Sequence, residues 1–333
     1  MARAPGRSEK RGETDEQKET GVPFKRSLPA ATVAAALMTL TAAASASAQH
    51  HVPYGSEALL DFTTAELLQP TTLAGANDGC RPSSTHPYPV VLIHGTIEDE
   101  GSNWVSLSPL LANEGYCVYA FNYGETALSL GGRVDGLGNI AHSAEELGTF
   151  VNRVLSQTGA SEVDLVGHSQ GGMMPNYYLK FLGGASKVNT LIGLAPSNHG
   201  TTVDGLITLA NSVPGASTIG SPLIEAAEAP ALAEQEVGSA FIKKLFGEGE
   251  PLEPSVRYVV IETNNDKVVT PYTNAFLHGP GVTDILVQEQ CARDETGHIG
   301  ITEDSPALAN VLNQLGPDDP SFKARCENFG ASI

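Results

Sequence analysis

Basic residues are scarce in this 333-residue sequence, and so are tryptophan and cysteine. Only 19 Lys and Arg residues stand against 38 Asp and Glu residues, so the formal net charge is −19 at pH 7. Nucleic acids and anionic membranes attract proteins through clustered positive charge, which this composition does not supply. We therefore expect a soluble acidic protein without a nucleic-acid partner.

Hydrophobic runs long enough to cross a membrane are also missing. The best candidate, residues 28–44, is short and rich in alanine, so no transmembrane anchor is expected in the mature form. It follows the charges of Lys25 and Arg26 and precedes Ala46-Ser47-Ala48, which resembles a signal-peptide cleavage site. The sequence thus predicts a secretory segment over residues 1–48 and a secreted, extracellular mature protein. A mis-assigned start codon would also explain the long charged stretch before residue 28.

The four cysteines all follow the predicted cleavage site, and no Cys-x-x-Cys spacing occurs among them. An even number of cysteines in an exported chain favours two disulfides over a metal site or reactive thiols. Three pairings are possible, and we favour Cys80–Cys117 with Cys291–Cys326 because these close loops of similar size. Each disulfide would contribute about 3–4 kcal/mol on the chain-entropy account.

The mature chain alternates short apolar runs with amphipathic segments. Strands are expected at 89–93, 117–121, 163–166, 188–194, 256–261 and 285–288. Helices are expected over 56–68, from Trp104 to Asn113, and over 140–156, 170–182 and 307–315. This alternation predicts an α/β fold, with a mostly parallel sheet covered by helices on both faces. Residues 49–333 should form one catalytic domain, and residues 201–249, which interrupt the alternation, either a cap insertion or a long surface excursion.

One stretch has the form of a nucleophile elbow. After the run Val163–Val166 comes Gly167-His168-Ser169-Gln170-Gly171, and the residues that follow can form a helix. The G-x-S-x-G pattern between strand and helix places a serine on a strained turn, where glycines two residues away allow close packing. The pattern alone is loose in a chain with 35 glycines. Its context makes Ser169 the candidate nucleophile.

A serine hydroxyl needs a general base, and that base needs a carboxylate that orients it. His298 follows the last predicted strand and is the favoured base, with His199 as the alternative. Asp266 follows the strand at 256–261 and is the favoured acid. Asp294 and Asp284 remain alternatives for the acid. The order Ser169, Asp266, His298 along the chain is that of an α/β-hydrolase.

The tetrahedral intermediate of acyl transfer also needs hydrogen-bond donors for its negative oxygen. The backbone N–H of Gln170, directly after the candidate nucleophile, is one expected donor. The loop after the strand at 89–93 should provide the second, and the N–H of Thr96 is the best candidate. The Thr96 hydroxyl could add a third hydrogen bond. An oxyanion hole made by Thr96 and Gln170 is therefore expected.

These residues resemble a known family. The matching segments are Val91-Leu92-Ile93-His94-Gly95-Thr96, Asn103-Trp104, Gly115-Tyr116-Cys117-Val118-Tyr119 and Gly167-His168-Ser169-Gln170-Gly171-Gly172-Met173-Met174-Pro175. They are similar to secreted bacterial lipases and esterases of the α/β-hydrolase superfamily, over roughly residues 75–310. The resemblance implies ester hydrolysis through an acyl-enzyme, with triacylglycerol or short- to medium-chain esters as substrates. It also implies the catalytic roles given above and a proline at position 175, although proline lacks the donor that a helix interior requires.

No cofactor or metal is expected for this chemistry, whereas a lipid–water interface is a possible partner. A polyester or cutin hydrolase, an acyltransferase and a peptidase remain alternatives, because the triad alone does not choose the acyl group or its acceptor. A dehalogenase would need an aspartate in place of Ser169. A non-catalytic binding module would be expected to lack at least one catalytic group, and none is missing here.

Overall fold

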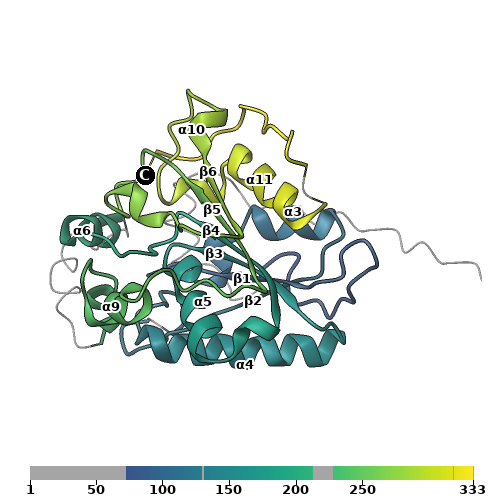
Figure 1. Cartoon of the computed structure of the whole chain (residues 1–333), viewed down its shortest axis with the longest axis horizontal. Coiled ribbons are helices and arrows are strands. Elements are labelled where there is room, and N and C mark those ends of the chain that lie inside the picture. The colour runs from purple at the N-terminus through teal and green to yellow at the C-terminus, as the bar shows by residue number, and fades with distance from the viewer. Residues whose placement is uncertain (1–72, 130, 213–227, 318, 333) are drawn as a thin grey trace, which may run out of the picture. The chain divides into compact units, whose positions relative to one another are not determined.

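The computed structural model describes residues 73–333, apart from 130, 213–227, 318 and 333. The predicted secretory segment 1–48 and the helix expected over 56–68 lie outside the described residues. At the centre is a six-stranded sheet in the order β2-β1-β3-β4-β5-β6, in which every neighbouring pair is parallel (Figure 1). The strands are β1 (Val90–Ile93), β2 (Val118–Phe121), β3 (Val163–His168), β4 (Val188–Leu194), β5 (Arg257–Glu262) and β6 (Val282–Leu286).

The strands contribute to two apolar cores, one on each side of the sheet. In β1, Val91 and Ile93 belong to the first core, and Val90 and Leu92 belong to the second. Successive side chains of a strand point to opposite faces, so a continuous apolar run fills both cores. The prediction of a parallel sheet with helices on both faces is confirmed.

The first core lies beneath α4 (Ile140–Thr158) and α5 (Gln170–Phe181). Asn139 begins α4, because its side chain accepts a hydrogen bond from the His142 N–H. Gly159 ends the helix in a left-handed conformation with φ 75°, which glycine adopts without strain. Local capping therefore sets both ends of the longest described helix close to the predicted bounds.

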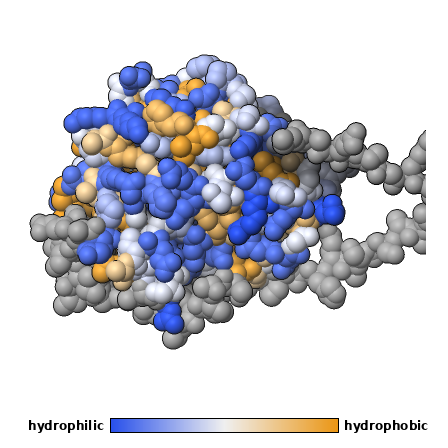
Figure 2. All heavy atoms as spheres, turned by 90° about the horizontal axis from the view of Figure 1, so that it is seen from below, coloured by the Kyte–Doolittle hydropathy of each residue, from blue (hydrophilic) through white to orange (hydrophobic). Residues whose placement is uncertain are grey.

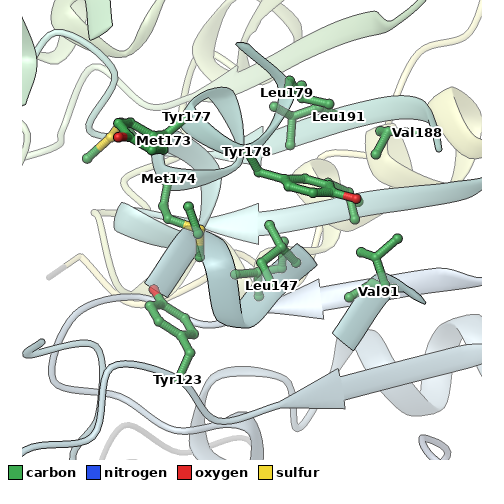
Figure 3. Close-up of a cluster of buried hydrophobic side chains, with 14 of the residues drawn as sticks. Val91, Tyr123, Leu147, Met173, Met174, Tyr177, Tyr178, Leu179, Val188 and Leu191 are labelled. Atoms are coloured by element: carbon green, nitrogen blue, oxygen red, sulfur yellow. The ribbon is translucent and has the colours of Figure 1, made fainter. Parts of the chain in front are cut away.

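Helix α5 contributes several large side chains to this core. Figure 3 shows Met174 and Tyr178 of α5 beside Leu147 of α4, all within the first core. Gly148 of α4 lets the Tyr178 ring approach, since an added Cβ there would lie 3.0 Å from the ring. This packing fixes α5 against the sheet and so fixes the turn at its amino end.

The second core lies beneath α3 (Leu107–Asn113), α10 (Val287–Gln290) and α11 (Ser305–Leu315). The helix expected from Trp104 to Asn113 begins instead at Leu107, as α3, and a separate short helix, α2 (Glu100–Asn103), precedes Trp104. Trp104 leaves the helical conformation with φ −121°, and its side chain is fully buried in the second core. The chain thus leaves the helical conformation at Trp104, the only tryptophan of the sequence, where the indole is buried in the second core.

The last strand also differs from its predicted bounds. The strand expected at 285–288 is β6 (Val282–Leu286), and residues 287 and 288 begin α10. Strand β6 is an edge strand with exposed residues at 283 and 284, whereas Val287 is fully buried in the second core. The apolar run is therefore divided between two elements: Ile285 and Leu286 end β6, and Val287 begins α10.

The segment 201–249, between β4 and β5, contains three described helices: α6 (Val203–Ser212), α8 (Pro230–Glu234) and α9 (Ala240–Phe246). Short 3-10 turns occur at Gly184–Ser186 (η1), Tyr272–Ala275 (η3) and Gly300–Thr302 (η4). Seen from the α4 side, hydrophilic residues are interspersed with small hydrophobic patches (Figure 2). Within the described ranges, no helix is long and apolar enough to cross a membrane.

Two disulfides tie peripheral segments to the sheet. Cys80 is joined to Cys117, the residue before β2, and Cys291, at the end of α10, is joined to Cys326 in the C-terminal tail. The Cα atoms are 5.5 and 5.3 Å apart, within the usual range. This is the pairing favoured from the loop sizes.

Candidate active site

Ser169 occupies the turn between β3 and α5, with φ 53° and ψ −121°. A residue with a side chain reaches such a conformation at a cost of about 1–3 kcal/mol, which is typically found at functional sites. Added Cβ atoms at Gly167 and Gly171 would collide with backbone atoms of the Gly171 region and of β1, respectively. The glycines of the motif are therefore required by close backbone contact, as expected of a nucleophile elbow. Pro175 lies inside α5.

Asp266 and His298 form a buried pair. The His298 Nδ1 lies 2.7 Å from Oδ2 of Asp266, and both side chains are 0% exposed. The other carboxylate oxygen of Asp266 accepts hydrogen bonds from the N–H groups of Val268 at 2.7 Å and Val269 at 2.8 Å. Three N–H groups thus converge on the one carboxylate of Asp266 and fix its orientation.

The second ring nitrogen of His298 is buried, and it has no hydrogen-bond partner among the described residues. With Nδ1–H donated to Asp266, the Nε2 atom is left as the acceptor that a general base needs. The elbow reaches the same loop, because Nε2 of His168 lies 2.9 Å from the His298 carbonyl oxygen. The structure therefore brings the residue before Ser169 into contact with the candidate base.

The alternative base has other partners. His199 Nδ1 lies 3.0 Å from the Asn274 carbonyl oxygen, and its Nε2 lies 3.2 Å from Glu250. Burial opposes a charge on this ring, but the hydrogen bond to Glu250 and the Asn274 carbonyl raise the pKa of His199. Because both ring nitrogens are engaged away from Asp266, His199 has the geometry of a structural residue.

Neither alternative acid is hydrogen-bonded to His298 among the described residues. Asp294 accepts a hydrogen bond from the Thr296 N–H at 2.9 Å and is paired with Asp304. Asp284 lies exposed in the edge strand β6. The contacts of the described residues thus favour Asp266 over both.

Thr96 is held between two amide side chains. Its hydroxyl oxygen accepts hydrogen bonds from Gln170 Nε2 at 2.6 Å and from Gln235 Nε2 at 2.8 Å. Two donors occupy both lone pairs of the hydroxyl, so its own hydrogen remains available for donation. The N–H of Gln170 stands at the first position of α5, where no intrahelical acceptor exists. The side chain of Gln170 therefore holds the Thr96 hydroxyl close to the first residue of α5.

Two residues of this site were missed by the sequence reasoning. Gln235, at the end of α8, is 2% exposed and also accepts a hydrogen bond from the Ser197 hydroxyl at 2.8 Å. Glu262 ends β5 and is fully buried; burial and the neighbouring Asp266 carboxylate raise its pKa well above the usual range. A lone glutamate closing the run Val-Val-Ile was the available signal for Glu262. Gln235 gave no signal, since it follows a short helix in the interrupted segment.

An apolar cluster adjoins these loops. Several of its members are next or close to candidate residues in the sequence, namely Ile97, Val268 and Ile299. Helices of the segment 201–249 contribute the rest of its larger side chains, Leu206, Leu209 and Leu232, with Leu137 from the loop before α4. The candidate site therefore combines polar side chains with apolar surroundings. As a separate point, no group of three or more His, Cys, Asp or Glu residues in the described part of the chain could hold a metal ion.

A cavity of about 620 Å³ lies between α3, α11 and the C-terminal tail. It is lined by Leu308 and Phe329 among others, and Ile299 also reaches it. Neither Ser169 nor Asp266 is among its lining residues. The cavity is therefore separate from the candidate catalytic groups.

Solved structures with the same arrangement show the α/β-hydrolase fold. Lipase B of Aspergillus fumigatus matches with a TM-score of 0.55 and 22% identity, over 76% of this chain and 56% of that one. The mature lipase BlEst2 of Bacillus licheniformis matches with a TM-score of 0.51 and 17% identity, over 71% of this chain and 94% of that one. The prediction of an α/β-hydrolase fold is confirmed.

The family follows from the sequence comparison. Residues 87–305 match the family described as Lipase (class 2), and the chain belongs to this family. It is 35% identical over 95 residues to triacylglycerol lipases of Pseudarthrobacter phenanthrenivorans and Burkholderia plantarii. Each alignment covers 27% of this chain. It covers 27% of the first relative and 24% of the second, so the chain matches only about a quarter of the length of these curated relatives. The expected membership of a lipase and esterase family is confirmed.

Proposed function

We propose that this chain is a secreted serine hydrolase that cleaves carboxylic esters through Ser169, His298 and Asp266. The observation that carries the proposal is the buried 2.7 Å contact between Asp266 and His298. Among the described residues His298 Nε2 has no hydrogen-bond partner, and the His298 carbonyl contacts the elbow at His168. In this reaction the Ser169 hydroxyl attacks the ester carbonyl and transfers its proton to His298 Nε2. The negative charge of Asp266 then stabilises the imidazolium.

The oxyanion of the tetrahedral intermediate would be bound by the N–H groups of Gln170 and Thr96 and by the Thr96 hydroxyl. His298 then donates its proton to the departing alcohol, which leaves an acyl group on Ser169. Water, deprotonated by His298, attacks this acyl-enzyme and releases the acid. The engagement of Thr96 by two amide donors supports its role, because its hydroxyl is already oriented as a donor.

The substrate we infer is an ester of a fatty acid, such as a triacylglycerol. The apolar cluster around Ile97, Leu206 and Leu232 supports an apolar acyl group, and the triacylglycerol lipases similar to this chain support the same class. We also propose that residues 201–249 form a cap over the site, since Gln235 from this segment contacts Thr96. The predicted secretory segment and the two disulfides support export.

The decisive test replaces the nucleophile. Ser169→Ala should abolish hydrolysis of p-nitrophenyl butyrate and leave the melting temperature within a few degrees of wild type. Ser143→Ala is the matched control, because Ser143 is also fully buried but lies in α4. Ester turnover that survives in Ser169→Ala would overturn the assignment of the nucleophile.

A second measurement identifies the acyl group. Rates on p-nitrophenyl esters from acetate to palmitate, and on emulsified tributyrin and triolein, separate a lipase from an esterase. We expect activity on emulsified long-chain substrates, because the curated relatives similar to this chain are triacylglycerol lipases. A preference for acetate with no activity on emulsions would contradict the fatty-acid substrate while leaving ester hydrolysis intact.

A further inference from the structure

A buried carboxylate lies behind the elbow. Glu98 is 2% exposed, and its Oε2 lies 2.9 Å from Nδ1 of His168, which is 1% exposed. His168 is the residue before Ser169, and the other nitrogen of its ring contacts the His298 carbonyl oxygen at 2.9 Å. Neither Glu98 nor His168 has a part in the triad or the oxyanion hole.

The contacts fit a His168 that donates from both ring nitrogens. If Glu98 is ionised, its oxygen and the His298 carbonyl oxygen are both acceptors, and an imidazolium satisfies the two together. The amide nitrogen of Asn103 also faces Nδ1, but at 3.2 Å, and the Asn103 oxygen is turned to the Gly95 N–H at 2.9 Å. The shorter contact is the one with Glu98.

The electrostatics agree with an ion pair. Burial opposes a charge on His168, but the Glu98 carboxylate, its hydrogen bond and the His298 carbonyl raise the pKa of His168. Burial likewise opposes a charge on Glu98, but the neighbouring His168 lowers the pKa of this carboxyl. A buried charge pair depends on its hydrogen bonds: each ring nitrogen of His168 has a partner and Glu98 Oε2 has two, whereas Glu98 Oε1 has none among the described residues.

Glu98 also holds the loop that carries Thr96. Its Oε2 accepts a hydrogen bond from the Gly95 N–H at 2.9 Å, in addition to the contact with His168. Between Thr96 and Glu98, Ile97 has a left-handed backbone with φ 61°, which is rare for a β-branched residue. Backbone contacts with Asp135 pin the same turn, since the Ile97 N–H donates to the Asp135 carbonyl at 2.8 Å. The strained loop is thus held from both sides.

We propose that the Glu98–His168 ion pair is a positioning device that locks the oxyanion loop, the nucleophile elbow and the loop of the catalytic base in one arrangement. The proposal rests on the proposed function for the roles of Thr96, Ser169 and His298. Glu98 binds the first loop through Gly95, and His168 belongs to the elbow and binds the third loop through the His298 carbonyl. Both are positioning residues, because neither contacts the reacting atoms.

The kinetic test compares variants of Glu98. Glu98→Ala should lower kcat for p-nitrophenyl butyrate by about 10²-fold, the usual effect of a small misplacement of catalytic groups, with KM changed by less than about threefold. Glu98→Gln should retain more activity than Glu98→Ala, because an amide can still bond the ring of a neutral His168. Glu100→Gln is the matched control. Glu100 is a buried carboxyl two residues later, at the start of α2, and it has no hydrogen bond to the elbow among the described residues. Wild-type kcat in Glu98→Ala would overturn the proposal.

A spectroscopic test is independent of turnover. In ¹⁵N-labelled protein, the ring of His168 should carry protons on both nitrogens at pH 7.5, and its signals are assigned by their loss in His168→Gln. In Glu98→Gln the same ring should carry one proton. A neutral His168 in the wild-type protein would overturn the ion pair. This readout decides the pair even if Ser169→Ala were to leave ester turnover unchanged and so defeat the proposed function.

A second variant covers the case in which Glu98→Ala does not fold. Removing one partner leaves an unpaired buried charge, whereas replacing both by apolar groups avoids it. Glu98→Met combined with His168→Phe should therefore fold, as measured by circular dichroism and melting temperature, and still lose about 10²-fold in kcat. A folded double variant with wild-type kcat would contradict the positioning role.

Discussion

The two halves of the candidate catalytic site are held by different kinds of contact. The elbow that carries Ser169 is packed closely against main chain: it joins a strand to a helix through a strained turn, and at Gly167 and Gly171 an added Cβ would meet backbone atoms of the elbow itself and of the end of β1. The loop that carries His298 is fixed by residues from elsewhere in the chain. The Thr263 hydroxyl donates to the Thr296 carbonyl at 2.7 Å, and the Gly297 N–H donates to the Ala331 carbonyl at 2.7 Å in the C-terminal tail.

This difference explains what each half tolerates. A side chain added to the elbow has no space, because the neighbouring atoms belong to the backbone and cannot move aside. A change in the base loop removes one of several side-chain and tail contacts, and the others remain. We therefore expect an added side chain to lower stability and activity most in the elbow. In the base loop, the loss of one hydrogen-bond partner should have a smaller effect that depends on which contact is removed.

The largest effect should come from Gly171→Ala. Its Cβ would overlap the backbone oxygens of Ile93 and His94. Overpacking usually costs 1–3 kcal/mol, and a collision with immobile backbone should reach about 3 kcal/mol or more, with loss of activity. Gly159→Ala is the control, because its Cβ would meet no atom within 4 Å and only its positive φ is unfavourable. Unfolding by urea measures both; equal losses would remove the distinction between the elbow and an open turn.

The next effect concerns the candidate acid, which lies in the loop after β5 and contacts His298. Asp266→Asn should lower kcat by about 10⁴-fold, because an amide can hold the base in the wrong tautomer and cannot stabilise an imidazolium. Asp294→Asn should cost far less, since Asp294 bonds the Thr296 N–H rather than a histidine. Steady-state rates on p-nitrophenyl butyrate measure both variants. The reverse ranking would transfer the role of the acid to Asp294.

The features that could be predicted from the sequence are the ones that local sterics impose. The continuous apolar runs gave the parallel strands, and Asn139 and Gly159 mark the ends of α4 through their own capping chemistry. The G-x-S-x-G pattern gave the strand, turn and helix around Ser169, because each of its glycines is needed where it stands. The break at Trp104 was missed, because it depends on burial in the second core rather than on local preference.

Contacts between distant segments had no local signal. Glu98 lies 70 residues before His168 in the sequence, and Gln235 lies 139 residues after Thr96, yet each pair is hydrogen-bonded and buried. Acidic residues in the loop after β1 resemble solvated turn residues, so nothing in the pattern set Glu98 apart. The candidate catalytic residues could thus be proposed from the serine motif and from positions after strands, whereas the residues that hold them required the tertiary structure.

The two disulfides allow the halves to be compared in one experiment. Replacing either cysteine pair by serines should lower the free energy of unfolding by about 3–4 kcal/mol, because both loops are of similar length. Only the loss of Cys291–Cys326 should also reduce kcat in the folded enzyme, since this disulfide anchors the tail that bonds Gly297. The Cys80–Cys117 variant is the control. Equal kcat values in the two folded variants would show that the tail does not position the base.

The last effect is a pH dependence of stability that arises in the base half. Asp304 begins α11, accepting hydrogen bonds from the N–H groups of Ala307 at 2.8 Å and Gly330 at 2.9 Å, and it is fully buried beside Asp294. Burial, together with the charge of Asp294, raises the pKa of Asp304 to about 7 although its backbone hydrogen bonds oppose this. The folded protein then keeps a proton that the unfolded chain releases near pH 4.

Between about pH 4 and pH 7 the native state therefore binds more protons than the unfolded state, and stability falls as the pH rises. One proton accounts for a slope of at most about 1.4 kcal/mol per pH unit. Asp304→Asn should flatten this slope and keep the helix cap, because asparagine is as good a capping residue as aspartate. Urea unfolding at intervals from pH 4.5 to 7.5 measures the slope. If it is unchanged in Asp304→Asn but flattened in Asp294→Asn, the proton belongs to Asp294, and the tail is held by an ionised Asp304.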